Sequence, residues 1–281
     1  MRWKKGRRSS NVEDRRGQRV GRGVKMGGGV TLLVVVAVLL LGGDPSALLQ
    51  MAGESPTTRT RAPTAAEDEM ADFVTVVLGS TEDAWSEIFA AAGQSYREPT
   101  LVLFTDMVQS ACGMNTAATG PFYCPPDQKV YIDVGFFREL ARIGGAGDFA
   151  QAYVVGHEVG HHVQNLVGTS DAVRQAQARS GGQSEANRLS VAMELQADCY
   201  AGVWAHQINR RGGEVVLEPG DVEEGLRAAA AIGDDRLMRS AGRAVNPESF
   251  THGSSEQRAM WLRRGLETGS VEACDTFGDD R

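Results

Sequence analysis

The chain is organised around the stretch Tyr153-Val-Val-Gly-His157-Glu158-Val-Gly-His161-His162-Val-Gln-Asn165, which contains the pattern H-E-x-x-H. The apolar residues around the pattern favour a partly buried helix. On a helix, residues four apart lie roughly 40° from each other around the axis and one turn along it, so His157 and His161 face the same way. Buried histidines need partners, and a shared metal ion supplies one to both. The alternative is a surface helix with solvated polar residues, which the apolar flanks disfavour.

Glu158 lies roughly 100° around the same helix, beside the expected metal but outside the ligand pair. Zinc suits such a site because it takes imidazole and carboxylate ligands and keeps one coordination position open. It also lowers the pKa of a bound water to about 7. The stretch therefore predicts Zn²⁺ bound by His157 and His161, with Glu158 as general base for the water.

A catalytic zinc needs a third protein ligand, and the best candidate is Glu194 in the segment Met193-Glu-Leu-Gln-Ala-Asp198. Apolar neighbours predict a largely buried helix, on which Glu194 and Asp198 share a face. Glu194 is expected to bind the metal, and Asp198 to accept a hydrogen bond from the far nitrogen of a ligating histidine. Structural ion pairs between these carboxylates and nearby cations are the alternative.

Three blocks of the chain are AYVVGHEVGHHVQ, MELQADCYAGVWA and ESFTHGSSEQRAMW, with SACG, GPFYCP and VYIDVGFF upstream. Together they resemble the putative neutral zinc metallopeptidase family of bacterial membrane-anchored proteins. The match covers roughly residues 66–277. The paired HExGH and E-x-x-A-D motifs resemble, more distantly, the CAAX-protease-like and HtpX-like gluzincins.

The resemblance implies an α+β fold, mainly α, in which a zincin-like metallopeptidase domain carries a small β-sheet. It assigns zinc to His157, His161 and Glu194, catalysis to Glu158 and a supporting role to Asp198. The distant relatives also have T-H-P followed by an arginine, which matches Thr251, His252 and Arg258, although Gly253 stands here in place of the proline.

Two further site residues follow from that last match. His252 is expected to donate a hydrogen bond to the oxyanion of a tetrahedral intermediate, and an ordinary solvent-facing loop histidine is the alternative. Arg258 is expected to support the site by pairing with Asp198 or Glu158, unless it is a plain helix-surface arginine.

These residues together predict a zinc-dependent endopeptidase that acts on peptide or protein substrates. One alternative is a membrane-tethered zinc-binding or assembly module without catalysis, in which Cys199 or His252 closes the metal's open position. A second alternative is a zinc amidase that acts on a cell-wall amide.

The chain's beginning predicts membrane attachment. Residues 1–26 hold ten Lys/Arg and two acidic residues, although the whole chain has a net charge of −7. The apolar run 27–43 follows and is long enough, at the short end, for one membrane span. The positive-inside rule then predicts a basic cytoplasmic arm at 1–26, an anchor helix at 27–43, a flexible linker at 44–67 and a periplasmic or extracytoplasmic domain at 68–281. A cleaved signal peptide and DNA binding by the arm are less favoured alternatives, so no nucleic-acid partner is expected.

The four cysteines suit export to an oxidising compartment. Three pairings are open from sequence alone. Proximity favours Cys112–Cys124, and Cys199–Cys274 follows by elimination; reduced core thiols would apply in the cytoplasm.

Local patterns predict the remaining elements. Residues 99–105 and 129–134 have the composition of short buried strands, and 184–211 that of a long helix. Apolar residues between 69 and 92 recur at helical spacing, with an expected break near Gly79-Ser80 and a new N-cap at Thr81. Ser254 and Gln257 predict a capping box.

Overall fold

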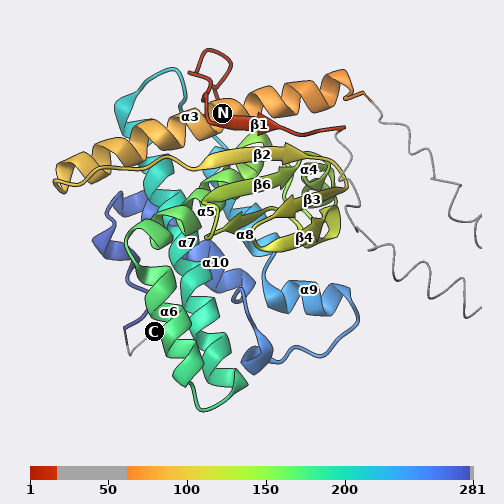
Figure 1. Ribbon diagram of the computed structural model, residues 1–281, viewed down its shortest axis with the longest axis vertical. Helices are drawn as coiled ribbons and strands as arrows, with labels where there is room; N and C mark the ends of the chain where they lie inside the picture. The colour runs from red at the N-terminus through yellow and green to blue at the C-terminus, as the bar shows by residue number, and fades with distance from the viewer. Residues whose placement is uncertain (18–61, 279–281) are drawn as a thin grey trace, which may run out of the picture. The chain divides into compact units, whose positions relative to one another are not determined.

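A computed structural model describes residues 1–17 and 62–278 of the chain (Figure 1). Met1–Arg16 and the chain from Pro63 onward form one compact unit. The anchor expected at 27–43 and most of the linker expected at 44–67 lie outside the described residues. Within the described ranges, no helix has both the length and the apolar character needed to cross a membrane.

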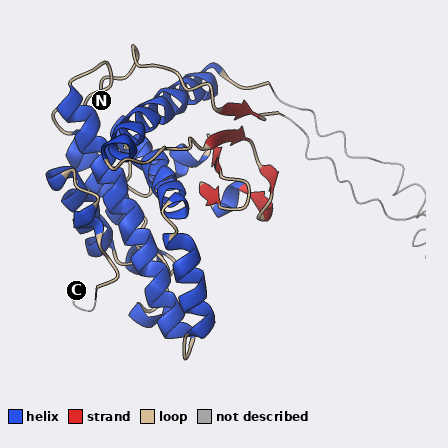
Figure 2. Ribbon diagram, turned by 60° about the vertical axis from the view of Figure 1, so that its left-hand side comes forward, coloured by secondary structure: helices blue, strands red, loops and turns tan. Residues whose placement is uncertain are grey.

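The described unit is an α+β fold, mainly helical, with a small sheet, as expected (Figure 2). The strands are β1 (Val12–Asp14), β2 (Thr100–Phe104), β3 (Met107–Ser110), β4 (Gly113–Thr116), β5 (Phe122–Cys124) and β6 (Lys129–Asp133). The helices are α3 (Ala65–Ala91), α4 (Phe136–Arg142), α5 (Asp148–Leu166), α6 (Thr169–Arg179), α7 (Gln183–Arg211), α8 (Asp221–Ala231), α9 (Asp234–Ser240) and α10 (Ser255–Thr268).

The main sheet has the order β1-β2-β6-β5, and β3 and β4 form a separate hairpin. Strands β1, β2 and β6 run parallel, and β5 pairs antiparallel with β6 at the edge. The two predicted strands are confirmed as β2 and β6, which are buried over all but their first residue. Side chains of α3, β2, β6, α5 and α7 share one hydrophobic core, so the motif-bearing helix α5 packs inside the domain.

The first sixteen residues differ from the separate basic arm that the sequence suggested. Val12 to Asp14 pair with Leu101 to Leu103 as the outer strand of the sheet. The α-amino group of Met1 lies 2.6 Å from the carboxylate of Asp148, the first residue of α5. The guanidinium of Arg16 donates to the carbonyl of Glu67, 2.7 Å away. These residues therefore fold as part of the domain.

Helix α3 is continuous, so the break expected near Gly79-Ser80 and the N-cap at Thr81 are wrong. The helix begins earlier, where Thr64 and Glu67 form a reciprocal capping box. Gly79 serves a packing role, because a Cβ there would lie 2.5 Å from the carbonyl oxygen of Arg7. The close crossing of the N-terminal segment requires this glycine.

Helices α7 and α10 cross at two glycines. A Cβ on Gly202 would lie 2.3 Å from the carbonyl oxygen of Leu262, and one on Gly265 would lie 2.0 Å from that of Cys199. Helix α10 begins with the predicted capping box, in which Ser254 accepts from the backbone of Gln257. The close crossing lies in the C-terminal half of both helices, and Arg258, near the start of α10, lies beside Asp198 in the middle of α7.

Candidate metal centre

Two histidines of α5 and one carboxylate of α7 converge, as the sequence predicted. Nε2 of His157 lies 3.2 Å from Oε2 of Glu194, and Nε2 of His161 lies 3.3 Å from Oε1 of the same carboxylate. The two imidazole rings stand 4.7 Å apart and nearly perpendicular, at 84°. All three side chains thus direct a potential ligand atom to one point.

This donor set fits a zinc ion. A tetrahedral zinc with ligand bonds of about 2.0–2.1 Å places its ligand atoms about 3.3 Å apart. The Nε2 atoms of His157 and His161 lie 3.2 and 3.3 Å from different oxygens of Glu194, and one possible ligand atom of each of the three side chains lies within 4.8 Å of the others. Two imidazoles and a carboxylate also leave the fourth position free of these three side chains. His157, His161 and Glu194 are therefore the residues that would hold the metal.

Asp198 supports the first of these histidines from one turn further along α7. Its Oδ1 lies 2.8 Å from Nδ1 of His157. Arg258 of α10 donates to both carboxylate oxygens at 2.9 Å, and the hydroxyl of Tyr153 donates to Oδ1 at 2.5 Å. Arg258 thus pairs with Asp198 rather than with Glu158, and it is a buried residue rather than a surface arginine. The carboxylate is satisfied on every side while it orients His157.

The pKa values of these groups depend on two opposing effects, burial and the charges of neighbouring side chains. Burial disfavours the charged imidazolium of His157, but Asp198 and Glu194 outweigh it and raise the pKa of His157 to about 10. Burial likewise opposes ionisation of Glu194, yet the two imidazoles hold its pKa well below the usual range. Without a metal the site therefore holds protons, which a cation must displace on binding.

Glu158 lies beside the ligands in a cavity of about 660 Å³. Burial raises the pKa of Glu158, and the positive field of His157 and His161 opposes that rise. The cavity passes between the segment 119–125 and helices α6 and α7. Its other lining residues include Phe136, Val154, Val173, Ile232 and Leu237, so its walls are largely apolar.

His252 also lines this cavity and keeps about half of its side chain exposed. Asp234, at the start of α9, holds the loop that carries it. One oxygen of Asp234 accepts from the backbone N–H groups of Thr251, His252 and Gly253, and the other lies 3.2 Å from Nδ1 of His252. Gly253 has φ +94°, a conformation that proline cannot adopt. The departure from the T-H-P pattern therefore changes this backbone, and Asp234 supplies its support.

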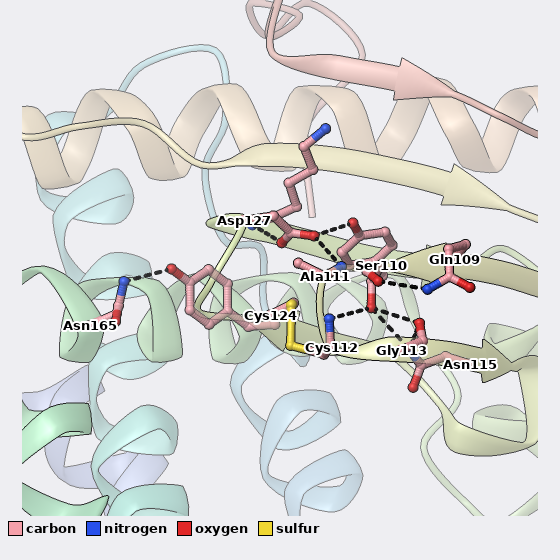
Figure 3. Close-up of a disulfide and its surroundings, with 12 residues drawn as sticks. Gln109, Ser110, Ala111, Cys112, Gly113, Asn115, Cys124, Asp127 and Asn165 are labelled. Atoms are coloured by element: carbon pink, nitrogen blue, oxygen red, sulfur yellow. Dashed lines mark hydrogen bonds between the residues drawn. A yellow bond between two sulfur atoms is a disulfide. The ribbon is translucent and has the colours of Figure 1, made fainter.

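The structure contains both expected disulfides, Cys112–Cys124 and Cys199–Cys274. Figure 3 shows the first beside the hairpin β3–β4, where Ser110 bonds to Cys112 and Asn115. The Cys112–Cys124 disulfide links the β3–β4 hairpin to β5, which lies at the wall of the cavity. Because Cys199 is bonded to Cys274, it cannot close the metal's open position.

The other histidines lie away from the ligands. His162 is enclosed between the hydroxyl of Tyr123 and the carbonyl of Arg97, and burial lowers its pKa to about 4. Nδ1 of His206 lies 2.8 Å from the carbonyl of Leu266. Both side chains thus hydrogen-bond within the fold rather than to the candidate ligands.

Sequence reasoning missed Tyr153, Gln164 and Asp234. Tyr153 stands four residues before His157 on the same face of α5, a spacing that could have indicated it. Gln164 follows His161 by three residues and lies 2.8 Å from its Nδ1. Asp234 is eighteen residues from His252, and no local spacing marks it.

Bacterial proteins are similar to this chain over most of its length. The chain matches the family model described as "Putative neutral zinc metallopeptidase" over residues 1–277. The Escherichia coli strain K12 "Uncharacterized protein YpfJ" is 47% identical over 292 aligned positions, which cover 99% of each chain. The Mycobacterium bovis "Uncharacterized protein Mb2605" is 41% identical over 212 residues, which cover 72% of this chain and 69% of that one. No solved structure matches this chain.

Proposed function

We propose that this chain, which belongs to the putative neutral zinc metallopeptidase family, is an endopeptidase that hydrolyses peptide bonds with a zinc ion held by His157, His161 and Glu194. The observation that carries the proposal is the convergence of the three side chains: each imidazole Nε2 lies 3.2 or 3.3 Å from an oxygen of the Glu194 carboxylate, close to the separation of ligand atoms around one tetrahedral zinc ion. When bound, the ion supplies Lewis acidity and lowers the pKa of a water at its open position.

Glu158 is the proposed general base. Its carboxylate lines the cavity next to both histidines, and burial raises its pKa toward the range in which a base and its conjugate acid both operate. Glu158 takes a proton from the attacking water and delivers it to the leaving amine. His252, whose Nδ1 faces Asp234, donates from Nε2 to the oxyanion that develops on the former carbonyl.

An extended peptide is the proposed substrate form. Strand β5 is an edge of the sheet, and no other strand of the described residues covers its outer side. Phe122 and Tyr123 of β5 line the cavity that contains the ligands. A peptide that adds to this edge gains backbone hydrogen bonds and lies across the site. The apolar walls favour uncharged side chains near the scissile bond.

The test compares three variants of the purified protein. Glu158→Gln should retain one zinc per chain and lose turnover of a denatured protein substrate by at least about 10²-fold. Glu194→Ala should lose zinc as well, because it removes a ligand. Glu267→Gln changes an exposed glutamate of α10 and should alter neither property. Undiminished turnover in Glu158→Gln would remove that residue from the mechanism.

Measurements on the same purified proteins distinguish the two alternative functions, a non-catalytic zinc-binding module and a zinc amidase. Zinc with four protein ligands, measured by X-ray absorption, would indicate the non-catalytic zinc-binding module. Release of a cell-wall amide without peptide cleavage would indicate the amidase. Binding of a hydroxamate at the open position of the metal supports hydrolysis.

We also propose that the folded unit works outside the cytoplasm. Its two disulfides support an oxidising compartment. A single crossing of the membrane by residues 27–43 would put residues 1–16 and the domain on opposite sides, which their common fold excludes. We therefore propose that residues 1–16 lie outside the cytoplasm with the domain, rather than in a cytoplasmic arm. Labelling of a cysteine introduced at an exposed position, Glu267→Cys, in intact cells against lysed cells measures that side directly, because the four native cysteines are disulfide-bonded.

A further inference from the structure

The two ligating histidines are supported in different ways. Nδ1 of His157 faces a carboxylate, whereas Nδ1 of His161 lies 2.8 Å from the side-chain oxygen of Gln164. A neutral histidine binds a metal through one nitrogen only when the other carries the proton. The partner of Nδ1 therefore decides whether Nε2 of His161 is free to be a ligand.

The hydrogen bonds of its side-chain nitrogen fix the orientation of the Gln164 amide. Its nitrogen donates to the carbonyl of Met193 at 2.8 Å and to the side-chain oxygen of Gln196 at 3.0 Å. Both partners are acceptors, so the nitrogen must point to them and the oxygen must face His161. An acceptor facing Nδ1 requires that Nδ1 carry the proton.

The orientation of Gln196 is fixed in the same way. Its nitrogen donates to the carbonyl of Cys274 at 3.1 Å. A backbone carbonyl accepts only, so the Gln196 oxygen must face Gln164. The polarity of the whole chain of hydrogen bonds, from Cys274 through Gln196 and Gln164 to His161, is thus set at its far end. Gln164, Gln196 and Cys274 are all buried, so water does not compete for these bonds.

The far end is held by a covalent bond. Cys274 is joined to Cys199, which follows Asp198 directly on α7. Beyond it, the hydroxyl of Thr276 donates to the carbonyl of Ala192 at 2.6 Å. The C-terminal segment thus lies along the part of α7 that carries Glu194, and the disulfide keeps the Cys274 carbonyl in place.

We propose that Gln164 and Gln196 are positioning residues that fix the tautomer of His161, and that the Cys199–Cys274 disulfide anchors them. The metal affinity of the centre then depends on a disulfide whose sulfur atoms do not touch the metal. This inference rests on the proposed zinc site. It adds that the C-terminal segment, held by the Cys199–Cys274 disulfide, helps to position a metal ligand of that site.

The experiment measures zinc affinity by competition with a chromophoric chelator, without reference to turnover. Gln164→Leu and Gln196→Leu should each weaken zinc binding about 10- to 100-fold, the usual effect of losing a residue that orients a metal ligand. The paired change Cys199→Ala with Cys274→Ala should weaken it to a similar degree. The matched control removes the other disulfide, Cys112→Ala with Cys124→Ala, and should bind zinc within about twofold of the unaltered protein.

A general loss of stability is separated from loss of positioning by two further measurements. Adding Gln196→Leu to the Cys199/Cys274 variant should cause little additional loss, because both changes act through one hydrogen-bonded chain. In the zinc-loaded unaltered protein, ¹⁵N spectra of the histidines should show a protonated Nδ1 on His161 that exchanges slowly. That signal should exchange faster in Gln196→Leu, even though its disulfide is intact.

The outcomes distinguish the two proposals. If the unaltered protein binds one zinc and both glutamine variants bind it equally well, the inference is wrong and the zinc site stands. If the unaltered protein binds no zinc, the proposed function fails and the inference fails with it. Equal losses from both disulfide removals would also overturn it, because they would indicate general destabilisation.

Discussion

Replacing Arg258 by methionine should destabilise the metal-free protein by about 3 kcal/mol. Arg258 is 2% exposed and Asp198 is fully buried, and two hydrogen bonds of 2.9 Å join them. Removing one partner of a buried ion pair typically costs about 3–5 kcal/mol, because the other charge is left uncompensated. We expect the lower end because His157, whose pKa is about 10, still offers Asp198 a positive partner at neutral pH.

The measurement is urea denaturation at pH 7 after chelator treatment, with both disulfides oxidised. Adding Asp198→Asn should recover at least about 1 kcal/mol, because the neutral amide no longer requires a cation. Arg263→Met changes an exposed arginine of the same helix and should stay within about 0.5 kcal/mol of the unaltered protein. A loss below about 1 kcal/mol in Arg258→Met, with an unchanged denaturant slope, would refute the assigned pairing.

Three other predictions concern packing, titration and catalysis. Gly265→Ala should cost about 1–3 kcal/mol in the same denaturation assay, because its methyl group would lie 2.0 Å from the carbonyl of Cys199, whereas Gly213→Ala meets open space and should cost little. His162 has a folded pKa of about 4 against an ordinary 6.5, so the unfolded chain takes up the proton first and stability should fall by up to about 3 kcal/mol as pH drops from 6.5 to 4. His162→Gln should lose this contribution, and an equal difference between the two proteins at pH 7 and pH 4.5 would contradict it. His252→Ala should lower kcat about 10²-fold with zinc content unchanged, and Asp234→Ala should lower it in the same direction; steady-state kinetics that show no change in kcat would assign both residues to the loop alone.

The sequence predicted those parts of the candidate metal centre whose geometry depends on residues close together in the chain. His157 and His161 share a face of one helix, as do Glu194 and Asp198, and a period of 3.6 residues suffices to predict each pair. The contact between the two helices followed from the chemistry of buried charge, since carboxylates in an apolar helix require positive partners.

Features that depend on distant contacts escaped prediction. A glycine such as Gly79 can either end a helix or make room for a crossing segment, and the neighbouring sequence is the same in both cases. Only the position of Arg7 in the fold shows that Gly79 makes room for a crossing segment. The segment Val12–Asp14 is too short and polar to show a strand pattern, so its place in the sheet came from pairing with Leu101–Leu103. Asp234 reaches His252 only because α9 folds back against the loop at 251–253.

Strand β1 makes the domain depend on a piece of chain that many shortened versions of the protein would omit. A version that begins at the linker, to avoid the apolar run, would lack this strand and leave the edge of β2 open. Unpaired edges of this kind recruit other chains, so we expect such a truncated protein to aggregate and a separately added peptide of residues 1–16 to restore its solubility. A protease that cuts between Arg16 and Pro63 should instead leave a nicked protein whose short fragment stays bound.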